Sequence, residues 1–327
     1  MRIRPASPVT RALLGLAVAA PVALGLVAPA AEAAPDTGAA PDTAATARAR
    51  VPLTIGHRGV PVQAPENTLA SIDRAARLGV RWVENDVQRT KDGKLVVIHD
   101  TTLTRTTDVK KRFPDRAPWK VGDFTLAEIR KLDAGSWFDR RFAGERVPTL
   151  DSYLRRVDHN RQKLLLEVKA PELYPGIERQ LVAELRRTGW LDRRHVGGRL
   201  VVQSFNAASL RTFHGLRPEV KTGFLGAPKP SELRDYAKFA DQINPDHTKV
   251  DAAWVRSVHG VKGPHGRRLE ISAWTVDDPA RAVALARLGV DAIITNAPHV
   301  IADALEEAGE EGAADRPLTL ADLPDAA

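Results

Sequence analysis

The chain has 327 residues, of which 43% are hydrophobic and 27% are charged, and it carries a formal net charge of +7 at pH 7. This is the composition of a globular protein, and the length suffices for one large domain with a full hydrophobic core. The absence of cysteine excludes disulfide bonds, thiol catalysis and cysteine zinc sites. The positive charge suits anionic substrates or an anionic cell envelope. The basic residues are scattered without an aromatic platform, which disfavours nucleic-acid binding.

Residues 1–33 have the pattern of a secretory signal peptide. Three arginines precede or enter an apolar run at residues 12–27, and Ala31-Glu32-Ala33 supplies small residues for a cleavage site. The alternative, a membrane anchor, is disfavoured because the run is short for a span and contains Pro21. We therefore expect a secreted or envelope protein without stable membrane insertion after signal removal. Loss of three arginines and one glutamate lowers the net charge from +7 to +5.

The two ends of the mature chain differ in composition from the part between them. Residues 34–50 are rich in Ala, Pro, Asp and Thr, which predicts a disordered linker. Residues 309–327 are acidic and contain proline, which predicts a flexible tail. The folded domain is therefore expected over residues 51–308.

Short apolar runs alternate with segments of helical periodicity from Val51 onward, which favours a parallel α/β barrel over a sandwich or a bundle. Nine segments have the pattern of strands: 51–55, 81–87, 95–98, 164–168, 200–203, 221–225, 242–244, 271–276 and 291–295. Helical patterns occupy residues 67–78, 126–132, 150–157, 177–187, 207–216, 231–240, 279–288 and 301–307. A closed barrel of this kind needs about eight strands, so one of the nine lies outside it, and the sequence leaves open which. The turn at 91–93 is too short for a parallel crossover, so the two strands that it joins depart from the βαβ repeat.

Residues 100–148 form a long excursion from this alternating pattern, after the third strand. The segment has three prolines, clustered charges and only one short helical pattern. Long loops on a compact domain usually serve as lids or binding loops.

Two carboxylates share one face of the second predicted strand. Side chains alternate along a strand, so Glu84 and Asp86 point the same way and Asn85 points the other. Burying two carboxylates together is costly unless a proton or a cation lies between them. Calcium and magnesium are hard cations that prefer such oxygen ligands. The alternative is an exposed edge strand with solvated acids.

Glu167 and Lys169 share a face at the end of the very apolar strand 164–168 in the same manner. Glu167 could complete the cation site, and Lys169 could meet a phosphate oxygen. A plain ion pair between them at the barrel mouth explains the pattern equally well.

His57 and His99 each follow a strand, and Arg58 comes directly after the first histidine. Cleavage of a phosphodiester needs a base for the attacking hydroxyl and an acid for the leaving alkoxide. Two histidines can supply both near neutral pH. The planar guanidinium of Arg58 suits the phosphate.

The chain resembles the glycerophosphodiester phosphodiesterases, in the secreted bacterial form, over about residues 53 to 305. The motifs that carry the resemblance are His57-Arg58-Gly59, Pro65-Glu66-Asn67-Thr68, Glu84-Asn85-Asp86-Val87, Thr90-Lys91-Asp92-Gly93, His99-Asp100, Glu167-Val168-Lys169, Gln203-Ser204-Phe205, Trp274-Thr275-Val276 and the run from Gly289 to Asn296. Their order and spacing make the match specific, although each alone is weak.

The resemblance implies a TIM-type barrel that hydrolyses glycerophosphodiesters to glycerol 3-phosphate and an alcohol. It implies that His57 and His99 are the acid–base pair and that Arg58 and Lys169 hold the phosphate. It also implies one divalent cation, calcium or magnesium, on Glu84, Asp86 and Glu167. In the mechanism proposed for the family, a glycerol hydroxyl attacks phosphorus and water then opens a cyclic phosphate.

Further residues are expected around these groups. Glu66 is expected to orient Arg58 or a histidine, with contact to the cation as the minor alternative. Trp274 and Phe205 either wall the pocket or belong to the core.

The sequence departs from the family pattern at two positions. Position 85 is usually aliphatic in the family, and Asn85 is expected to face the helix layer and to affect packing more than chemistry. Asn296 stands where aspartate is common, and the missing charge is expected to alter a hydrogen bond at the barrel mouth.

Other functions remain open from the sequence. The same barrel could act as a phospholipase D on lysophospholipids or sphingomyelin, or it could degrade polyglycerolphosphate wall polymers. The basic residues of 100–148 favour water-soluble or polymeric substrates over lipids. A non-catalytic barrel that binds phosphodiesters is disfavoured, because every expected catalytic residue is present. The sequence leaves the head group, the resident cation and the oligomeric state undetermined.

Overall fold

The computed structural model describes residues 51–314, with side chains described for residues 51–310. The predicted signal peptide and linker, and residues 315–327 of the predicted tail, lie outside the described residues. No helix within the described part of the chain has the length and apolar composition needed to cross a membrane.

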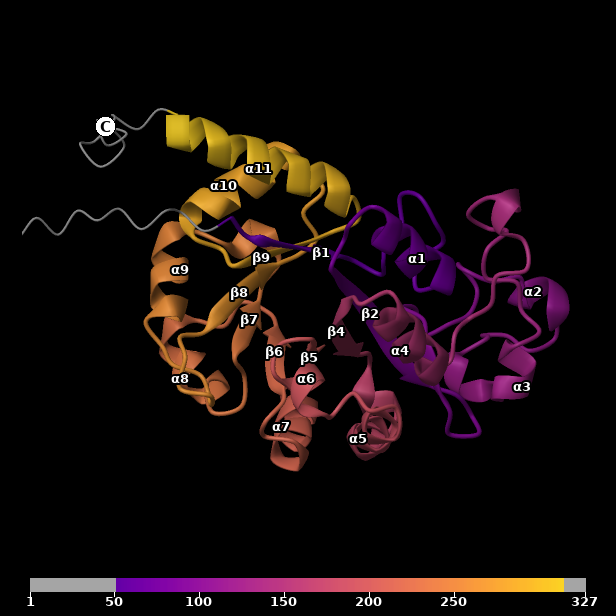
Figure 1. The fold of residues 1–327 in the computed structure, drawn as a ribbon. Coiled ribbons are helices and arrows are strands. Elements are labelled where there is room, and N and C mark those ends of the chain that lie inside the picture. The colour runs from indigo at the N-terminus through magenta and orange to yellow at the C-terminus, as the bar shows by residue number, and fades with distance from the viewer. Residues whose placement is uncertain (1–50, 315–327) are drawn as a thin grey trace, which may run out of the picture. The chain divides into compact units, whose positions relative to one another are not determined.

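Eight parallel strands form a closed TIM-type barrel with helices on its outside (Figure 1). The barrel strands are β1 (Leu53–Gly56), β2 (Trp82–Arg89), β4 (Lys163–Val168), β5 (Leu200–Ser204), β6 (Lys221–Leu225), β7 (Gln242–Asn244), β8 (Glu270–Ala273) and β9 (Ala292–Thr295). Each pairs with the next, and β1 pairs with both β2 and β9, which closes the barrel. The predicted fold class is confirmed.

The helices connect the strands and cover the barrel. They are α1 (Leu69–Arg77), α2 (Val109–Arg112), α3 (Leu126–Ile129), α4 (Leu150–His159), α5 (Ile177–Arg187), α6 (Arg193–Val196), α7 (Ala207–Leu216), α8 (Leu233–Tyr236), α9 (Ala252–His259), α10 (Pro279–Leu288) and α11 (Pro298–Ala314). Short 3-10 turns lie at Val121–Asp123, Arg140–Phe142, Pro171–Leu173, Pro230–Glu232 and His247–Lys249.

The ninth strand, β3 (Leu95–Val97), lies outside the barrel. It pairs antiparallel with β2 across the turn at Thr90–Gly93, as the short link between the two strands predicts. The sequence left open which strand was the extra one, because its apolar composition is the same as that of a barrel strand.

Several helices differ from the sequence-based expectation, and the four-residue helices α2 and α6 were not expected. The helix expected over 231–240 is a 3-10 turn followed by the short α8. The last helix begins at Pro298 and continues past Gly309 to Ala314. Helix α9 was not expected from the sequence. Its recognisable features are Asp251, whose side chain caps the helix, and the apolar residues Trp254, Val255 and Val258, which are buried on one helical face.

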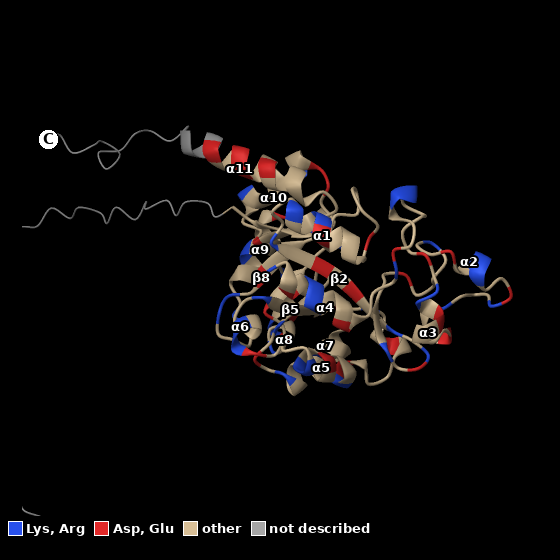
Figure 2. Cartoon of the chain, turned by 45° about the vertical axis from the view of Figure 1, so that its right-hand side comes forward, with Lys and Arg blue, Asp and Glu red and all other residues tan. Residues whose placement is uncertain are grey.

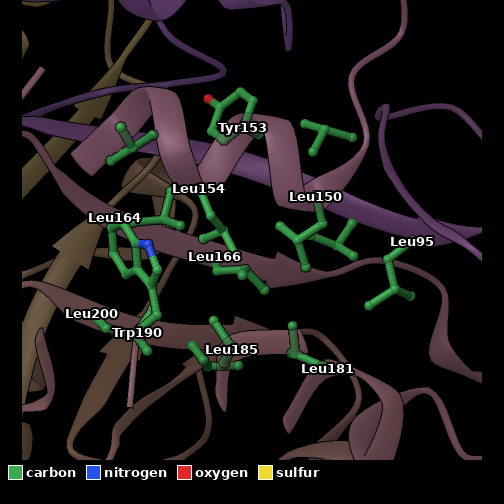
Figure 3. Close-up of a cluster of buried hydrophobic side chains, with 14 of the residues drawn as sticks. Leu95, Leu150, Tyr153, Leu154, Leu164, Leu166, Leu181, Leu185, Trp190 and Leu200 are labelled. Carbon is green, nitrogen blue, oxygen red and sulfur yellow. The ribbon is translucent and has the colours of Figure 1, made fainter. Parts of the chain in front are cut away.

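The hydrophobic core has two layers separated by the wall of the barrel. Figure 3 shows the outer layer, in which side chains of α4 such as Tyr153 and Leu154 pack against Leu164 and Leu166 of β4. The inner layer fills the barrel with Ile55, Leu165, Val201, Ala292 and Ile294. Alternation along the strands sends successive residues to these two layers, which places the next inward residues at the barrel mouth.

The excursion at 100–148 is a small compact unit beside the barrel, at the right in Figure 1. It has a hydrophobic cluster of its own, which includes Leu103, Val121, Phe124, Ile129 and Leu132, all of them fully buried. These apolar residues are irregularly spaced, so neither helical nor strand periodicity reveals them in the sequence.

Asn85 lies in the outer layer of the core, as the alternation along β2 predicts. It is paired in register with Leu166 and is completely buried. Neither its amide nitrogen nor its amide oxygen has a hydrogen-bond partner among the described residues. A buried amide without partners costs about 1–3 kcal/mol of stability.

We predict that Asn85→Leu, which keeps the shape of the side chain, raises the free energy of unfolding by about 1–3 kcal/mol. For a domain of this size each kcal/mol raises Tm by about 2–4 °C, which thermal unfolding measures.

The matched control is Gln88→Met on the same strand. The amide nitrogen of Gln88 donates to the carbonyls of Ile98, His99 and Asp100 at 2.8–2.9 Å, and its oxygen accepts from the Tyr174 hydroxyl at 2.9 Å. This variant should lower Tm, because it removes an amide whose bonding capacity is used. A lower Tm for Asn85→Leu would contradict the assignment of an unpaired amide.

Candidate functional site

The residues selected from the sequence gather at the carboxyl ends of the barrel strands. His57, Lys169, Phe205 and Trp274 follow the ends of β1, β4, β5 and β8, while the carboxylates lie within β2 and β4. Because parallel strands all end at the same mouth of a barrel, residues from distant parts of the chain meet there. His99 reaches this mouth from the loop that follows β3.

Glu84, Asp86 and Glu167 form one buried cluster, with one carboxylate oxygen of each lying within 4.8 Å of the others. Their exposed fractions are 1%, 1% and 6%. β2 is paired on both sides, so the alternative of an exposed edge strand with solvated acids is wrong. Asp86 Oδ1 and Glu167 Oε1 are buried and form ion pairs with the Lys169 ammonium. Clustered oxygens of buried carboxylates are the donor set that calcium and magnesium need, so these residues fit a hard divalent cation.

The pKa values of the cluster reflect this crowding. Burial, with repulsion from Asp86 and Glu167, raises the pKa of Glu84 well above its usual value. Burial and the charge of Asp86 raise the pKa of Glu167 to about 8. Burial also acts on Asp86, but the positive charges of Arg58 and Lys169 outweigh it and lower the pKa of this group. Without a cation, the cluster therefore holds protons at neutral pH.

Two positively charged side chains border the carboxylates. Lys169 Nζ lies 3.0 Å from Glu167 Oε1 and 3.5 Å from Asp86 Oδ1. The expected Glu–Lys ion pair is thus present, and the same lysine also approaches a second acid. Arg58 Nε lies 3.5 Å from Asp86 Oδ2, and the Arg58 backbone N–H donates to Glu84 at 2.9 Å.

The backbone around Arg58 has an unusual conformation. Arg58 and Asn67 have φ values of 53° and 58°, and Gly59 has a φ of 95°. A Cβ at Gly59 would lie 2.3 Å from Ser71 Oγ, so only glycine fits there. Asn67 stabilises the turn by donating its amide to Asp86 Oδ2 at 2.8 Å. Strained backbone of this kind is typical of functional sites.

The two histidines have different hydrogen-bond partners. His57 Nδ1 lies 2.8 Å from the side-chain oxygen of Asn296, a neutral amide. Burial and the neighbouring charge of Arg58 lower the pKa of His57 to about 4. His99 Nδ1 lies 2.8 Å from the carboxylate of Asp100. His99 therefore has a charged hydrogen-bond partner, whereas the hydrogen-bond partner of His57 is neutral.

Arg105, from the excursion, links both halves of the site. It donates two hydrogen bonds to Asp100 at 2.8 Å and two to Glu66 at 2.7 Å. Glu66 in turn accepts from Arg58 at 2.9 Å, as the expected orienting contact requires. Burial opposes ionisation of Glu66, but its bonds to Arg105 and Arg58 prevail and lower its pKa. The excursion thus contributes a residue to the network that holds His99 and Arg58.

Two aromatic side chains lie at the mouth beside Lys169. Phe205 is 50% exposed, and its ring packs edge-to-face on Trp274 with 5.5 Å between the ring centroids. Trp274 also packs on the inner core layer and donates from its indole to Asn244 O, which ties it to the core. A cleft of about 510 Å³ opens between Lys169, Phe205 and the loops after β4 and β5.

Sequence reasoning missed three residues of this network. Arg105 sits in a segment without periodicity, and only its closeness in sequence to His99 hinted at a role. Gln88 could have been found, because it shares the inward face of β2 with Glu84 and Asp86. Asp277, which contacts Asn296, had no signal in the sequence.

A model of the glycerophosphoryl diester phosphodiesterase family matches residues 57–300. A glycerophosphodiester phosphodiesterase of Caldanaerobacter subterraneus is 35% identical over 261 residues, covering 79% of this chain and 99% of that protein. One from Bacillus subtilis is 34% identical over 262 residues, covering 76% of this chain and 84% of that protein.

A solved structure shows the same similarity. The structure of an Oleispira antarctica phosphodiesterase in complex with the product sn-glycerol-3-phosphate matches with a TM-score of 0.63 and 29% identity. The match covers 78% of this chain and 97% of that chain.

We predict that calcium or magnesium stabilises the chelator-treated protein, and more at pH 8 than at pH 5.5. The raised carboxylate pKa values mean that the cation-free protein loses stability as pH rises from about 4.5 toward 8, where a cation replaces the protons. At about 100 times Kd the gain is about 2.7 kcal/mol. That gain corresponds to about 5–10 °C in Tm by thermal unfolding.

The control is Glu167→Gln, which removes one charge and keeps the shape. It should raise Tm of the cation-free protein at pH 8 and reduce the stabilisation by the cation. An undiminished effect of the cation on this variant would contradict the assigned ligands.

Proposed function

Because the chain belongs to the glycerophosphoryl diester phosphodiesterase family and is a glycerophosphodiester phosphodiesterase, we propose a more specific activity. The enzyme hydrolyses glycerophosphodiesters to sn-glycerol 3-phosphate and an alcohol, with one divalent cation and two histidines. The observation that carries the proposal is the meeting of three buried carboxylates, two histidines and two cationic side chains at one barrel mouth. The product bound to the Oleispira antarctica enzyme supports the same reaction.

Glu84, Asp86 and Glu167 would hold the cation, calcium or magnesium. When bound, it neutralises phosphate charge and lowers the pKa of the attacking hydroxyl. Lys169 and Arg58 already lie against these carboxylates, so they bring positive charge to the place where a phosphate would sit. The fork of Arg58, fixed by Glu66, orients the phosphate oxygens, and Lys169 attracts them as a point charge.

The different partners of the two histidines separate their roles. His57, with a pKa lowered to about 4, is neutral near pH 7 and accepts the proton of the attacking hydroxyl. His99 is held against the Asp100 carboxylate, which orients its ring, and it protonates the leaving alkoxide. Arg105 and Gln88 keep this second histidine in place through Asp100 and the backbone.

The side chains around the opening of the barrel mouth determine which substrates the site accepts. Phe205 offers an exposed aromatic face beside Lys169, whose Nζ lies 5.6 Å from the ring centroid. Lys110, Lys111 and Arg112 belong to α2, which lies beside the barrel (Figure 2). The positive charges favour water-soluble phosphodiesters over lipid substrates. Lysophospholipids, sphingomyelin and polyglycerolphosphate are the substrates to compare.

We predict that purified residues 34–327 release glycerol 3-phosphate from glycerophosphocholine or glycerophosphoethanolamine. Chelator should abolish turnover, and calcium or magnesium should restore it. His57→Ala and His99→Ala should each lower kcat by about 10²–10⁴-fold, because each removes one proton transfer.

The matched control is His159→Ala, at the exposed end of α4 and remote from the carboxylates. It should keep wild-type turnover. Wild-type kcat in both catalytic-site variants would refute the proposal. Turnover on lipids or wall polymer alone would replace the substrate class.

We also propose export by residues 1–33, on the basis of their charge and apolar pattern. Mass spectrometry of protein from the culture medium or envelope should then find a mature chain that begins at Ala34. An intact amino terminus at Met1 would contradict export by this route.

A further inference from the structure

His57 can act as a base only if its proton lies on the nitrogen that faces away from substrate. Its Nδ1 faces the side chain of Asn296 at 2.8 Å. If the amide oxygen of Asn296 faces the ring, Nδ1 carries the hydrogen and Nε2 keeps its lone pair. If the amide were turned by 180°, its NH₂ group would donate to Nδ1 and the hydrogen would move to Nε2. The orientation of one amide therefore decides which nitrogen is free.

Asp277, in the loop between β8 and α10, fixes this orientation. Its Oδ2 accepts from the amide NH₂ of Asn296 at 2.7 Å, and its Oδ1 accepts from the Asn296 backbone N–H at 2.8 Å. The hydroxyl of the fully buried Thr295 donates to the same Oδ1 at 2.9 Å. A carboxylate only accepts hydrogen bonds, so the NH₂ group must face Asp277 and the oxygen must face His57.

We propose that Asn296 and Asp277 are positioning residues that set the tautomer of His57 and leave Nε2 free as the proton acceptor. The inference rests on the proposed role of His57 as the base. The two loops that carry Asn296 and Asp277 come from the neighbouring strands β9 and β8. The neutral amide orients the imidazole without placing a second negative charge beside it.

The decisive variant is Asp277→Asn. The side-chain oxygen of the new asparagine would accept the hydrogen bonds from Thr295 and from the Asn296 backbone N–H, so its NH₂ group would take the place of Asp277 Oδ2. This NH₂ group would face the NH₂ group of Asn296. The Asn296 amide would therefore rotate by 180°, so that its oxygen accepts from position 277. Its own NH₂ group then faces His57 Nδ1, which places the hydrogen on Nε2 and blocks the base. We expect kcat to fall by about 10- to 100-fold with KM little changed, the effect of one misplaced hydrogen bond.

Exchange of the two residues tests the mechanism directly. In the double variant Asp277→Asn, Asn296→Asp, the carboxylate at position 296 accepts from both His57 Nδ1 and the new amide at position 277. The hydrogen returns to Nδ1, and kcat should recover to within a few-fold of wild type. A purely structural role of Asp277 would not give recovery by a second substitution.

The matched control is Asp278→Asn, the same chemical change one residue away. Asp278 caps α10 by accepting from Ala280 N at 3.0 Å and does not contact Asn296. It should retain wild-type kcat. Nitrogen NMR of histidine-labelled protein should show a protonated Nδ1 at His57 in the wild type and the double variant, and a protonated Nε2 in Asp277→Asn.

The outcomes are separable. Wild-type kcat and tautomer in Asp277→Asn, or no recovery in the double variant, would overturn the inference. If His57→Ala lacks turnover while Asp277→Asn retains it, only the proposed control of the His57 tautomer by Asp277 and Asn296 is wrong. If His57→Ala retains turnover, the proposed catalytic role of His57 is itself wrong.

Discussion

Three carboxylates buried within one barrel mouth are the constraint around which the site is organised. Glu84, Asp86 and Glu167 lie on inward faces of two adjacent strands, where their mutual repulsion and the loss of water oppose ionisation. Such a cluster is stable only if bound protons or nearby positive charges compensate it. Arg58 and Lys169 supply part of that charge, and a divalent cation would supply more. The same demand for positive charge makes the mouth receptive to a phosphodiester.

The compensating side chains are themselves held by a second set of contacts. Glu66 orients Arg58, and Arg105 binds Glu66 and Asp100 together. The excursion at 100–148 therefore supports the site through Arg105, and its own hydrophobic cluster gives that arginine a stable base. Its contribution differs from that of a simple lid, because it adds hydrogen bonds to groups that flank the expected reacting atoms.

The two histidines at the barrel mouth have different hydrogen-bond partners. His99 Nδ1 lies against a carboxylate and His57 Nδ1 against an amide. Different partners can give identical side chains different roles, and they support the acid and base assignments proposed above. The amide partner of His57 has a defined direction only because Asp277 accepts from it.

Local pattern in the sequence determined the alternating architecture, the shared face of Glu84 and Asp86, and the burial of Asn85 in the helix layer, because strand periodicity fixes which side chains share a face. Motif order also selected the three carboxylates that the structure brings together. Only the tertiary structure decided that β3 leaves the barrel, that Arg105 joins Glu66 to Asp100, and that Asn296 contacts His57. These contacts depend on how distant segments meet: His57 and Asn296 are 239 residues apart and become neighbours only when β9 closes the barrel against β1. Periodicity shows which residues of one helix or strand share a face. It carries no information about which distant segment packs on that face.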